Sequence, residues 1–316
     1  MHSRCLYCYR VIDAGQIDYH PACSKTFFGT ATPPILPFAE DQMLDLAFDV
    51  IRSRSTVPGV QKKLSLEIAD GTPKNEPSRF TIVGLWGRYV LKPPAAGYPQ
   101  LPEVEDLTMH LASLAEITTV PHSLIRMSSG NLAYITRRID RTKTGKLHME
   151  DMCQLTERLT EQKYQGSYEQ VGKAISKYSD TPGLDVLNFA EQVVFSFLTG
   201  NADMHLKNSS LINQPGIGYC LAPAYDMVAT ALVNPGDKED VALTLNGKKK
   251  NIRMSDFRAS FTTLGLDEKQ QRNIFAKFTA AMPAWMDFIG ISFLSAEMKE
   301  AYKRLLSIKW KHLTEG

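Results

Sequence analysis

The sequence predicts an α+β protein, with a mostly antiparallel sheet in its first half and mainly helices in its second half. Before residue 140, apolar and polar residues alternate over several short segments, which is typical of strands buried on one face. After residue 180, apolar residues recur at helical spacing over longer segments. With 316 residues, the chain can bury one large core or two medium ones.

The first 29 residues are expected to form a small Cys/His-rich segment. Cys5, Cys8, His20 and Cys23 follow the pattern C-x2-C-x11-H-x2-C. Three thiolates and an imidazole can close a tetrahedron around Zn2+, and such a site is structural because no ligand position stays open. The alternative is a set of reduced cysteines that pack on the main body without metal. Zinc would supply folding energy that so short a segment lacks.

Residues 30–42 are rich in proline and are expected to be a linker. Helical spacing of apolar residues then predicts an amphipathic helix over 43–51. A turn-rich loop follows at 53–61. It contains Gly59, which lets the backbone approach phosphates closely because it has no side chain.

Alternating or clustered apolar residues predict strands at 64–68, 80–83, 88–92 and 132–139. Pro102 and Glu103 open a helix among these strands, with proline and an acid in its first turn. In the second half, the broad apolar face of 186–199 predicts a central helix that ends at Gly200. Further helices are expected at 268–283 and 294–313, and a short strand at 219–222.

Two acids and an amide follow the predicted central helix. Asp203 and Asn208 stand five residues apart, and Asp226 comes eighteen residues later at the end of a predicted strand. One acid can lie beside an incoming hydroxyl, while the amide and the second acid can hold Mg2+. Such a set can move a phosphoryl group, because that reaction depends on positioning and charge neutralisation. Each residue alone would be typical of a turn or cap.

Lys92 ends a predicted strand with apolar neighbours, where a lysine can clamp nucleotide phosphates if a carboxylate holds it. Glu103 and Glu105 begin the next helix and are the candidate partners. A strand-end lysine in solvent is the commoner case. However, the order of strand lysine, helix glutamate, Asp-Asn pair and hairpin Asp is that of a protein kinase. Neither a Walker A sequence nor G-x-G-x-x-G occurs, so those nucleotide sites are excluded.

The composition limits the function classes. Lys+Arg is 36 and Asp+Glu is 34, so the net charge of +2 gives no reason to expect direct nucleic-acid binding. The basic run 248–250 is expected to be a solvated hairpin. No apolar run is expected to reach the roughly 20 residues of a membrane span, and the N-terminus lacks a signal-peptide core. A cytoplasmic protein with reduced cysteines is therefore expected, with Cys153 and Cys220 in the core.

The chain resembles the HipA-like serine/threonine kinases, the toxins of bacterial toxin–antitoxin modules. The matching motifs, in family order, are GVQKKLS (59–65), YVLKP (89–93), LPEVE (101–105), RIDR (138–141), HMEDMCQ (148–154), GNADMHLKN (200–208), LAPAYD (221–226) and LTLNG (243–247). The resemblance implies a two-lobed protein-kinase-like fold. Its mostly antiparallel N-lobe would span 43–139 and its helical C-lobe 140–316.

The resemblance also implies roles for individual residues. Asp203 would be the general base, and Asn208 and Asp226 would hold Mg2+. Lys92 would contact the ATP phosphates, tied to Glu105. The remaining nucleotide-site residues would be His205, Lys207 and Tyr225, the hinge residues Arg137, Arg138 and Ile139, and the phosphate-side loop of Pro58, Gly59, Val60, Gln61, Lys62 and Lys63.

In this family the phosphate-side loop carries a hydroxyl residue whose phosphorylation disables the site. The usual serine is Thr56 here, Ser55 is the alternative, and Pro58 stands where some relatives have a second serine. Arg137 stands where the hinge often has an acid. Autophosphorylation of the 53–61 loop is thus expected in kind, with the residue left open.

The resemblance implies transfer of the ATP γ-phosphoryl group to Ser/Thr of a translation-related protein, with an aminoacyl-tRNA synthetase the leading candidate, and hence growth arrest. A helix-turn-helix antitoxin of HipB type would be a partner and would provide the only contact with DNA. A separate small protein would replace the extra N-terminal domain of longer members. Two alternatives stay open: a metal-dependent phosphohydrolase using Asp203, His205 and Asp226, and a catalytically silent binding module.

Overall fold

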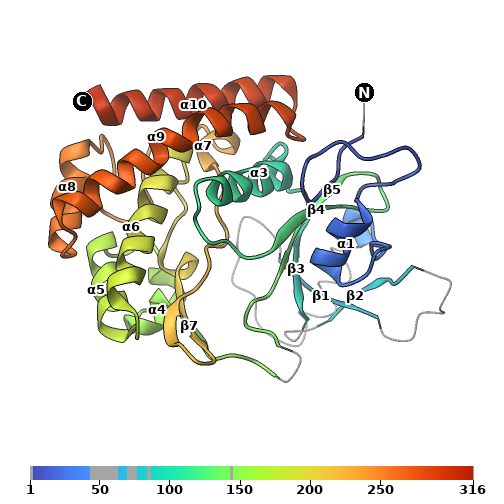
Figure 1. Ribbon diagram of the computed structural model, residues 1–316, viewed down its shortest axis with the longest axis horizontal. Helices are drawn as coiled ribbons and strands as arrows, with labels where there is room; N and C mark the ends of the chain where they lie inside the picture. The colour runs from blue at the N-terminus through green and yellow to red at the C-terminus, as the bar shows by residue number, and fades with distance from the viewer. Residues whose placement is uncertain (1–2, 43–62, 70–76, 84–86, 143–144, 316) are drawn as a thin grey trace. The chain divides into compact units, whose positions relative to one another are not determined.

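The computed structural model describes residues 3–42, 63–69, 77–83, 87–142 and 145–315 (Figure 1). The chain divides into two compact units. Unit 1 comprises residues 1–106 and 120–139, and unit 2 comprises residues 107–119 and 140–316. The helix predicted at 43–51 and the loop predicted at 53–61 lie outside the described residues.

Unit 1 contains an antiparallel sheet of five strands within the described residues (Figure 1). In spatial order these are β2 (Phe80–Ile82), β1 (Leu64–Ile68), β3 (Tyr89–Lys92), β5 (Leu132–Arg137) and β4 (His122–Arg126). Four of these strands were predicted. Strand β4 was not, because its first four residues are all buried and leave no alternating pattern.

Aromatic side chains join the N-terminal segment of unit 1 to this sheet. Helix α1 (Pro21–Phe28) contributes Phe27 and Phe28, whose ring centroids lie 4.7 Å apart. Phe28 lies 6.0 Å from Phe80 of β2, and Phe80 lies 5.3 Å from Tyr89 of β3. Edge-to-face packing of this kind adds to the burial of large apolar rings. The segment therefore shares its core with the sheet.

The proline-rich stretch after α1 is bonded to the same unit. The Ile35 backbone N–H donates to Ser78 O at 2.8 Å, and the Phe80 N–H donates to Ile35 O at 3.0 Å. The N–H of Ser128 donates to Phe38 O at 3.2 Å. Ile35 thus pairs with the chain beside β2, at the edge of the sheet. The domain boundaries expected from the sequence remain predictions.

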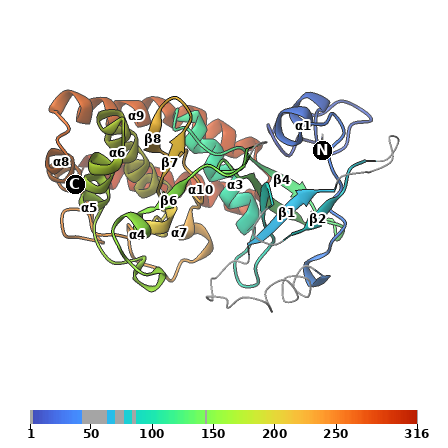
Figure 2. The same cartoon turned by 90° about the horizontal axis from the view of Figure 1, so that it is seen from below.

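Unit 2 is mainly helical, with a small antiparallel sheet (Figure 2). The helix α3 (Leu101–Leu114) enters it from unit 1. Its described helices are α4 (Met152–Leu155), η1 (Thr160–Gln162), α5 (Tyr168–Tyr178), α6 (Pro182–Thr199), η2 (Leu206–Asn208), α7 (Thr230–Val233), α8 (Met254–Thr263), α9 (Glu268–Ile291) and α10 (Ala296–Glu315). The described strands are ordered β6 (Met149–Asp151), β7 (Ser210–Gln214) and β8 (Gly218–Leu221).

The core of unit 2 forms around α6, as the broad apolar face of this helix predicted. Phe195 of α6 packs edge-to-face on Trp285 of α9, with 5.5 Å between ring centroids. The Trp285 indole N–H donates to Leu111 O at 2.8 Å, which satisfies its one buried donor. Helix α9 continues past Pro283 to Ile291, so the predicted end at residue 283 was wrong.

Helix α9 bears on the expectation about membrane spans. Among the described residues it is the one helix long and apolar enough to cross a membrane, with a mean hydropathy of 1.2 over 18 residues. A core helix meets the same criteria. Its Phe278, Trp285 and Ile289 are buried in unit 2, so this finding is a weak indication of a span.

Two lysines of the basic run 248–250 form ion pairs, which were not expected of a solvated hairpin. Lys248 Nζ lies 2.8 Å from Oδ1 of the buried Asp256, and Lys249 Nζ lies 3.5 Å from Glu239. Burial alone would raise the pKa of Asp256, but its hydrogen bonds, with that from Lys248 the largest, lower it. Lys248 therefore links this turn to helix α8.

Candidate active site

The candidate site of unit 2 begins at the C-terminus of α6, where Gly200 reverses the chain. Gly200 has φ 68° and ψ 34°, in the left-handed region that favours glycine. Its N–H donates to Phe197 O at 3.2 Å, and a Cβ atom at this position would lie 2.8 Å from Ala231 Cβ. Only glycine therefore fits without a shift of neighbouring atoms.

Hydrogen bonds fix the backbone between this glycine and Asp203. The Asp203 N–H donates to Asn201 Oδ1 at 3.1 Å, and the Ala202 N–H donates to Thr230 Oγ1 at 2.9 Å. The Ala231 N–H donates to Gly200 O at 3.0 Å. Helix α7 thus holds the turn from the other side, and the position of Asp203 is determined by both elements.

The Asp203 carboxylate accepts a hydrogen bond from the hydroxyl of Tyr164 at 2.6 Å. The chain around Tyr164 is attached to the same region, because the Leu206 N–H donates to Lys163 O at 3.1 Å. Burial raises the pKa of Tyr164, and its hydrogen bond to Asp203 and the carboxylate charge raise it further. The sequence analysis missed Tyr164, which lies 39 residues before Asp203 in a loop without a recognisable pattern.

His205 lies next to this pair and is buried. Its ring meets that of Tyr164 edge-on, with 5.0 Å between centroids and 77° between planes. Burial lowers the pKa of His205, while the negative charges of Asp203 and Asp226 act in the opposite direction. Nδ1 of this histidine is buried and has no hydrogen-bond partner among the described residues. Burial therefore favours the neutral form of the His205 ring.

Asn208 and Asp226 are joined directly. The Asn208 side-chain N–H donates to Asp226 O at 3.4 Å. Asp226 adopts φ 55°, an uncommon conformation for a residue with a side chain, which surrounding structure must enforce. The chain before it is held by the bonds Ala222 N–H to Ser210 O at 2.9 Å and Ala224 N–H to Thr118 O at 2.8 Å.

This pair of residues suits a magnesium ion. Asn208 and Asp226 offer amide and carboxylate oxygens, the hard ligands that Mg2+ prefers. No hydrogen bond to the Asn208 side-chain oxygen is present within the described residues, so this atom is free to serve as a ligand. The donor set fits Mg2+ better than it fits zinc, for which sulfur and nitrogen are typical.

Lys207 and Tyr225 are positioned by different contacts. Lys207 Nζ lies 2.5 Å from Asp151 Oδ2, and Asp151 also caps the N-terminus of α4. The Tyr225 hydroxyl donates to Lys207 O at 3.1 Å and is hydrogen-bonded to Ser210 Oγ. Burial raises the pKa of Tyr225. Both residues therefore brace the strands behind Asn208, and their predicted contact with nucleotide remains a prediction.

In unit 1, Lys92 and Glu105 form a buried ion pair. The exposed fractions of the two residues are 3% and 1%, so the lysine is not the solvated one that is commoner at strand ends. Lys92 Nζ also lies 5.3 Å from the centroid of the Tyr134 ring, on the neighbouring strand β5. Of the two candidate glutamates, Glu105 is thus the partner of Lys92.

The other predicted site residues have less defined positions. The backbone N–H groups of Arg137 and Arg138 donate to Pro121 O and Arg88 O, at 2.9 and 2.8 Å. The adenine base of a nucleotide would therefore have to contact other groups of this stretch. Ile139 follows them, and Lys63 is exposed. The rest of the predicted phosphate-side loop lies outside the described residues, including Thr56 and Ser55. The four predicted zinc ligands do come together, within unit 1.

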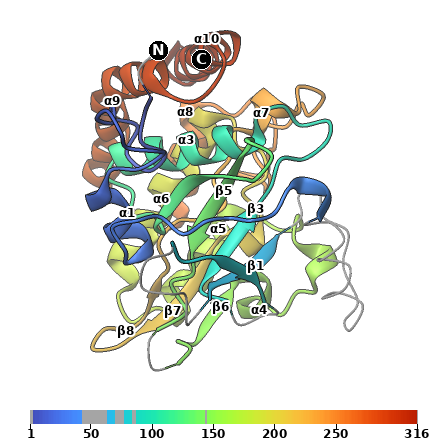
Figure 3. The ribbon, with the colours of Figure 1, turned by 90° about the vertical axis from the view of Figure 1, so that its right-hand side faces the viewer.

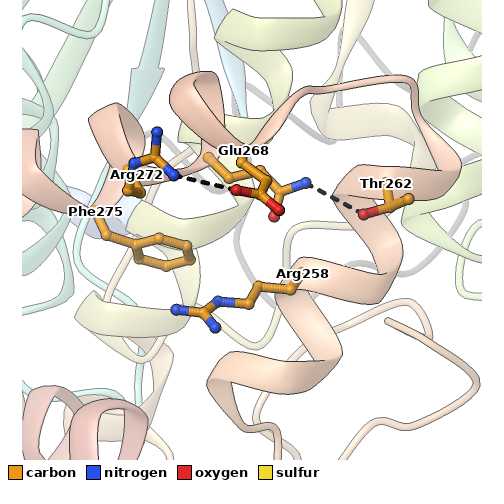
Figure 4. A pocket seen from close by; sticks show the side chains of 6 residues that line it. Arg258, Thr262, Glu268, Arg272 and Phe275 are labelled. Carbon is orange, nitrogen blue, oxygen red and sulfur yellow. Dashed lines mark hydrogen bonds and ion pairs between the residues drawn. The ribbon is translucent and has the colours of Figure 1, made fainter.

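A separate pocket of about 320 Å³ opens between α8 and α9 in unit 2 (Figure 4). Its polar side chains largely pair with one another: Arg272 lies 3.3 Å from Glu268, and Gln271 donates to Thr262 at 3.2 Å. None of its lining residues belongs to the set of Asp203, Asn208 and Asp226. We assign it no role in the chemistry.

The lysine of an antiparallel sheet pairs with a glutamate of the helix that follows it, and a helical unit carries Asp203, Asn208 and Asp226. This combination defines a protein of kinase-like α+β fold. The chain belongs to the HipA-like C-terminal domain family, whose model matches residues 55–286. The matched residues include Lys92 and Glu105, and also Asp203, Asn208 and Asp226.

Two proteins similar in sequence to this chain are named as putative kinases. The chain is 31% identical over 214 residues to "Putative kinase Y4dM" of Sinorhizobium fredii, covering 64% of this chain and 51% of the relative. It is 27% identical over 210 residues to "Putative kinase" of Haemophilus influenzae, covering 63% and 59%. The matched region thus spans about half the length of these relatives.

Two solved structures share the fold. One is HipA in the Shewanella oneidensis complex of HipA, HipB and operator DNA, with a TM-score of 0.70 and 18% identity over 97% of this chain and 75% of that one. The other is the Helicobacter pylori proinflammatory kinase CtkA, with a TM-score of 0.56 and 15% identity over 80% and 94%. These similarities confirm the predicted kinase-like fold.

Proposed function

We propose that the chain is a HipA-type serine/threonine protein kinase that transfers the γ-phosphoryl group of ATP to a protein hydroxyl. The proposal rests on two contacts within unit 2. Asn208 is hydrogen-bonded to Asp226, and Tyr164 is hydrogen-bonded to the Asp203 carboxylate. Family membership supports it, since the matched region contains all of these residues.

In this proposal Asp203 accepts the proton of the substrate Ser or Thr hydroxyl. The hydroxyl oxygen forms a bond to the γ-phosphorus, the bond to the bridging oxygen breaks, and ADP leaves with that electron pair. Tyr164 keeps the Asp203 carboxylate oriented through its hydrogen bond. A positioned base of this kind accelerates proton transfer typically by a factor of about 10²–10⁴.

Asn208 and Asp226 would hold Mg2+ through their side-chain oxygens. Such an ion, when bound with ATP, neutralises phosphate charge. Lys92 would contact the phosphates, and Glu105 would fix its ammonium group in place. His205, Lys207 and Tyr225 would lie near the nucleotide, and the hinge residues Arg137 to Ile139 would contact its adenine base.

Regulation and partners belong to the same proposal. Phosphorylation of Thr56 or Ser55 would inactivate the site, and a translation-related protein such as an aminoacyl-tRNA synthetase would be the substrate. The Shewanella HipA structure contains HipB and operator DNA, which supports a HipB-type antitoxin and indirect contact with DNA. A cytoplasmic location and growth arrest complete the proposal.

The test compares ATP consumption by the purified chain with and without candidate substrate proteins, in Mg2+ and in EDTA. The proposal expects Mg2+-dependent label on a protein hydroxyl, and phosphopeptide mapping would identify both the substrate residue and any residue of the 53–61 loop. Release of inorganic phosphate without labelled protein, in the presence of cellular extract, would instead indicate the phosphohydrolase. No ATP consumption at all would indicate a binding module.

A further inference from the structure

Three cysteines and a histidine of the N-terminal segment meet at one point of unit 1. The ligand atoms of Cys5, Cys8, His20 and Cys23 all lie within 4.8 Å of one another. Nδ1 of His20 lies 3.4 Å from Cys8 Sγ and 3.6 Å from Cys23 Sγ. These spacings require only small inward movements to reach a common metal ion.

The orientation of His20 supports a metal ligand. Its Nε2 lies 3.0 Å from Val11 O, and because a carbonyl oxygen only accepts, Nε2 carries the proton. Nδ1 of the neutral ring then directs a lone pair toward the two sulfur atoms. A metal-bound histidine commonly donates its other N–H to a carbonyl in this way. Three sulfur donors and one nitrogen donor favour tetrahedral Zn2+.

The segment held by these ligands reaches the helix that carries Glu105. The Tyr9 side chain, adjacent to Cys8, is fully buried, and its hydroxyl donates to Asp106 Oδ2 at 2.8 Å. The other oxygen of Asp106 lies 2.7 Å from Nδ1 of His122, on strand β4. Asp106 directly follows Glu105 in α3, so Tyr9 fixes the helix next to the partner of Lys92.

A second set of bonds ties the same segment to the sheet. The Leu124 N–H donates to Leu6 O at 3.2 Å, and the Ser123 hydroxyl oxygen lies 3.2 Å from the same carbonyl oxygen. The Tyr19 hydroxyl donates to Leu124 O. Leu6 lies between Cys5 and Cys8, and Tyr19 precedes His20, so these anchoring residues lie close in the chain to the four ligands. Figure 1 labels β4 and β5 beside this segment, which is drawn in blue, and Figure 3 shows the blue segment from another side, near β5.

We propose that Cys5, Cys8, His20 and Cys23 bind one structural Zn2+, and that this ion positions Tyr9 against Asp106 and thereby stabilises the Lys92–Glu105 pair. Zinc would replace the weak contacts that now link the four ligand side chains with strong bonds to one ion. Tyr9 is then a positioning residue, which acts on Lys92 through Asp106 and α3. The effect on nucleotide binding rests on the proposed function. Zinc binding and the stabilisation of α3 do not depend on it.

Metal analysis of the purified full chain tests the first part. One zinc per chain is expected, with Cys8→Ser losing most of it and Cys220→Ser, the same substitution on β8, retaining it. Absence of zinc after expression with added zinc would overturn the proposal, as would iron in its place. Full zinc content in Cys8→Ser would overturn it as well.

Hydrogen exchange of the α3 amides tests the second part. Tyr9→Phe should retain zinc but exchange the amides of residues 104–107 about tenfold faster, because a hydrogen bond to a buried carboxylate is lost. Tyr7→Phe, two residues away in the same segment, should exchange like the wild type. Unchanged α3 exchange in Tyr9→Phe would overturn the link.

A separate readout connects this link to the proposed function. Tyr9→Phe is expected to weaken binding of a non-hydrolysable ATP analogue several-fold, while Tyr7→Phe leaves it unchanged. If the wild type binds no nucleotide, the proposed function fails, but the zinc content and the α3 exchange still decide the positioning claim. Faster α3 exchange with unaltered analogue affinity would contradict the effect on Lys92.

Discussion

The hydroxyl of Tyr164 donates a hydrogen bond of 2.6 Å to the carboxylate of Asp203. This contact orients the residue that we propose as base, and it comes from a loop far away in the sequence. Tyr164→Phe should therefore lower the turnover number about tenfold while the KM for ATP stays unchanged. Tyr178→Phe, at an exposed site on α5, should behave as wild type. Steady-state kinetics with a labelled substrate protein distinguishes the two, and normal turnover in Tyr164→Phe would contradict the assignment.

The buried pair of Lys92 and Glu105 gives a prediction about stability. Glu105→Leu leaves the Lys92 charge buried without its carboxylate and should destabilise the protein by about 3–5 kcal/mol. The double variant Lys92→Met/Glu105→Leu should recover most of that loss, because neither charge then remains. Urea unfolding measures both variants.

The same double variant separates folding from function. It should be folded but inactive, since Lys92 is proposed to contact the phosphates. An active double variant would rule out that role, and an unaffected Glu105→Leu single variant would contradict the energetic importance of the pair. Arg272→Ala, which removes an exposed i,i+4 pair with Glu268, should change stability by less than about 1 kcal/mol and serves as control.

Gly200 gives a prediction about the turn before Asp203. Gly200→Ala places a side chain in the left-handed region and within 2.8 Å of Ala231 Cβ, so it should cost about 2 kcal/mol or more. Gly183→Ala is the matched control. No atom lies within 4 Å of its added Cβ in the described structure, and the helical position should make it neutral or slightly stabilising. Equal unfolding free energies for the two variants would contradict this account of the turn.

His205 predicts how stability depends on pH. Because burial lowers its pKa in the folded state, the unfolded chain binds a proton more readily below the ordinary value of about 6.5. Its contribution to stability is therefore fully present above that pH and is lost as the pH falls toward the folded pKa. His205→Gln should show a smaller loss between pH 7.5 and pH 5.5, measured by urea unfolding. An identical loss in both proteins would contradict the burial effect.

Local patterns explain what the sequence could predict. Alternation located four strands of unit 1, and the broad apolar face located α6, because each reflects burial of a single element. Strand β4 escaped because it is buried on both faces. Helix α5 was missed although Ser167 and Gln170 form a capping box at its start, a signal that was present in the sequence.

The candidate site shows the same division. Asp203, Asn208 and Asp226 could be identified because they occupy a short turn and the end of a hairpin. Tyr164 could not, since its contact with Asp203 depends on how the loop after η1 packs on the turn. The ion pair of Lys207 with Asp151 is likewise a tertiary contact, between η2 and the end of β6, which spacing along the chain does not encode.

The central claim is that Asp203 acts as base in phosphoryl transfer from ATP. The most direct measurement is the rate at which the purified chain transfers label from γ-labelled ATP to a protein substrate, compared with that of Asp203→Ala under identical conditions. We predict that Asp203→Ala loses transfer, and with it toxicity, while its circular dichroism and unfolding midpoint stay close to the wild type. Labelling by Asp203→Ala at the wild-type rate would contradict the account.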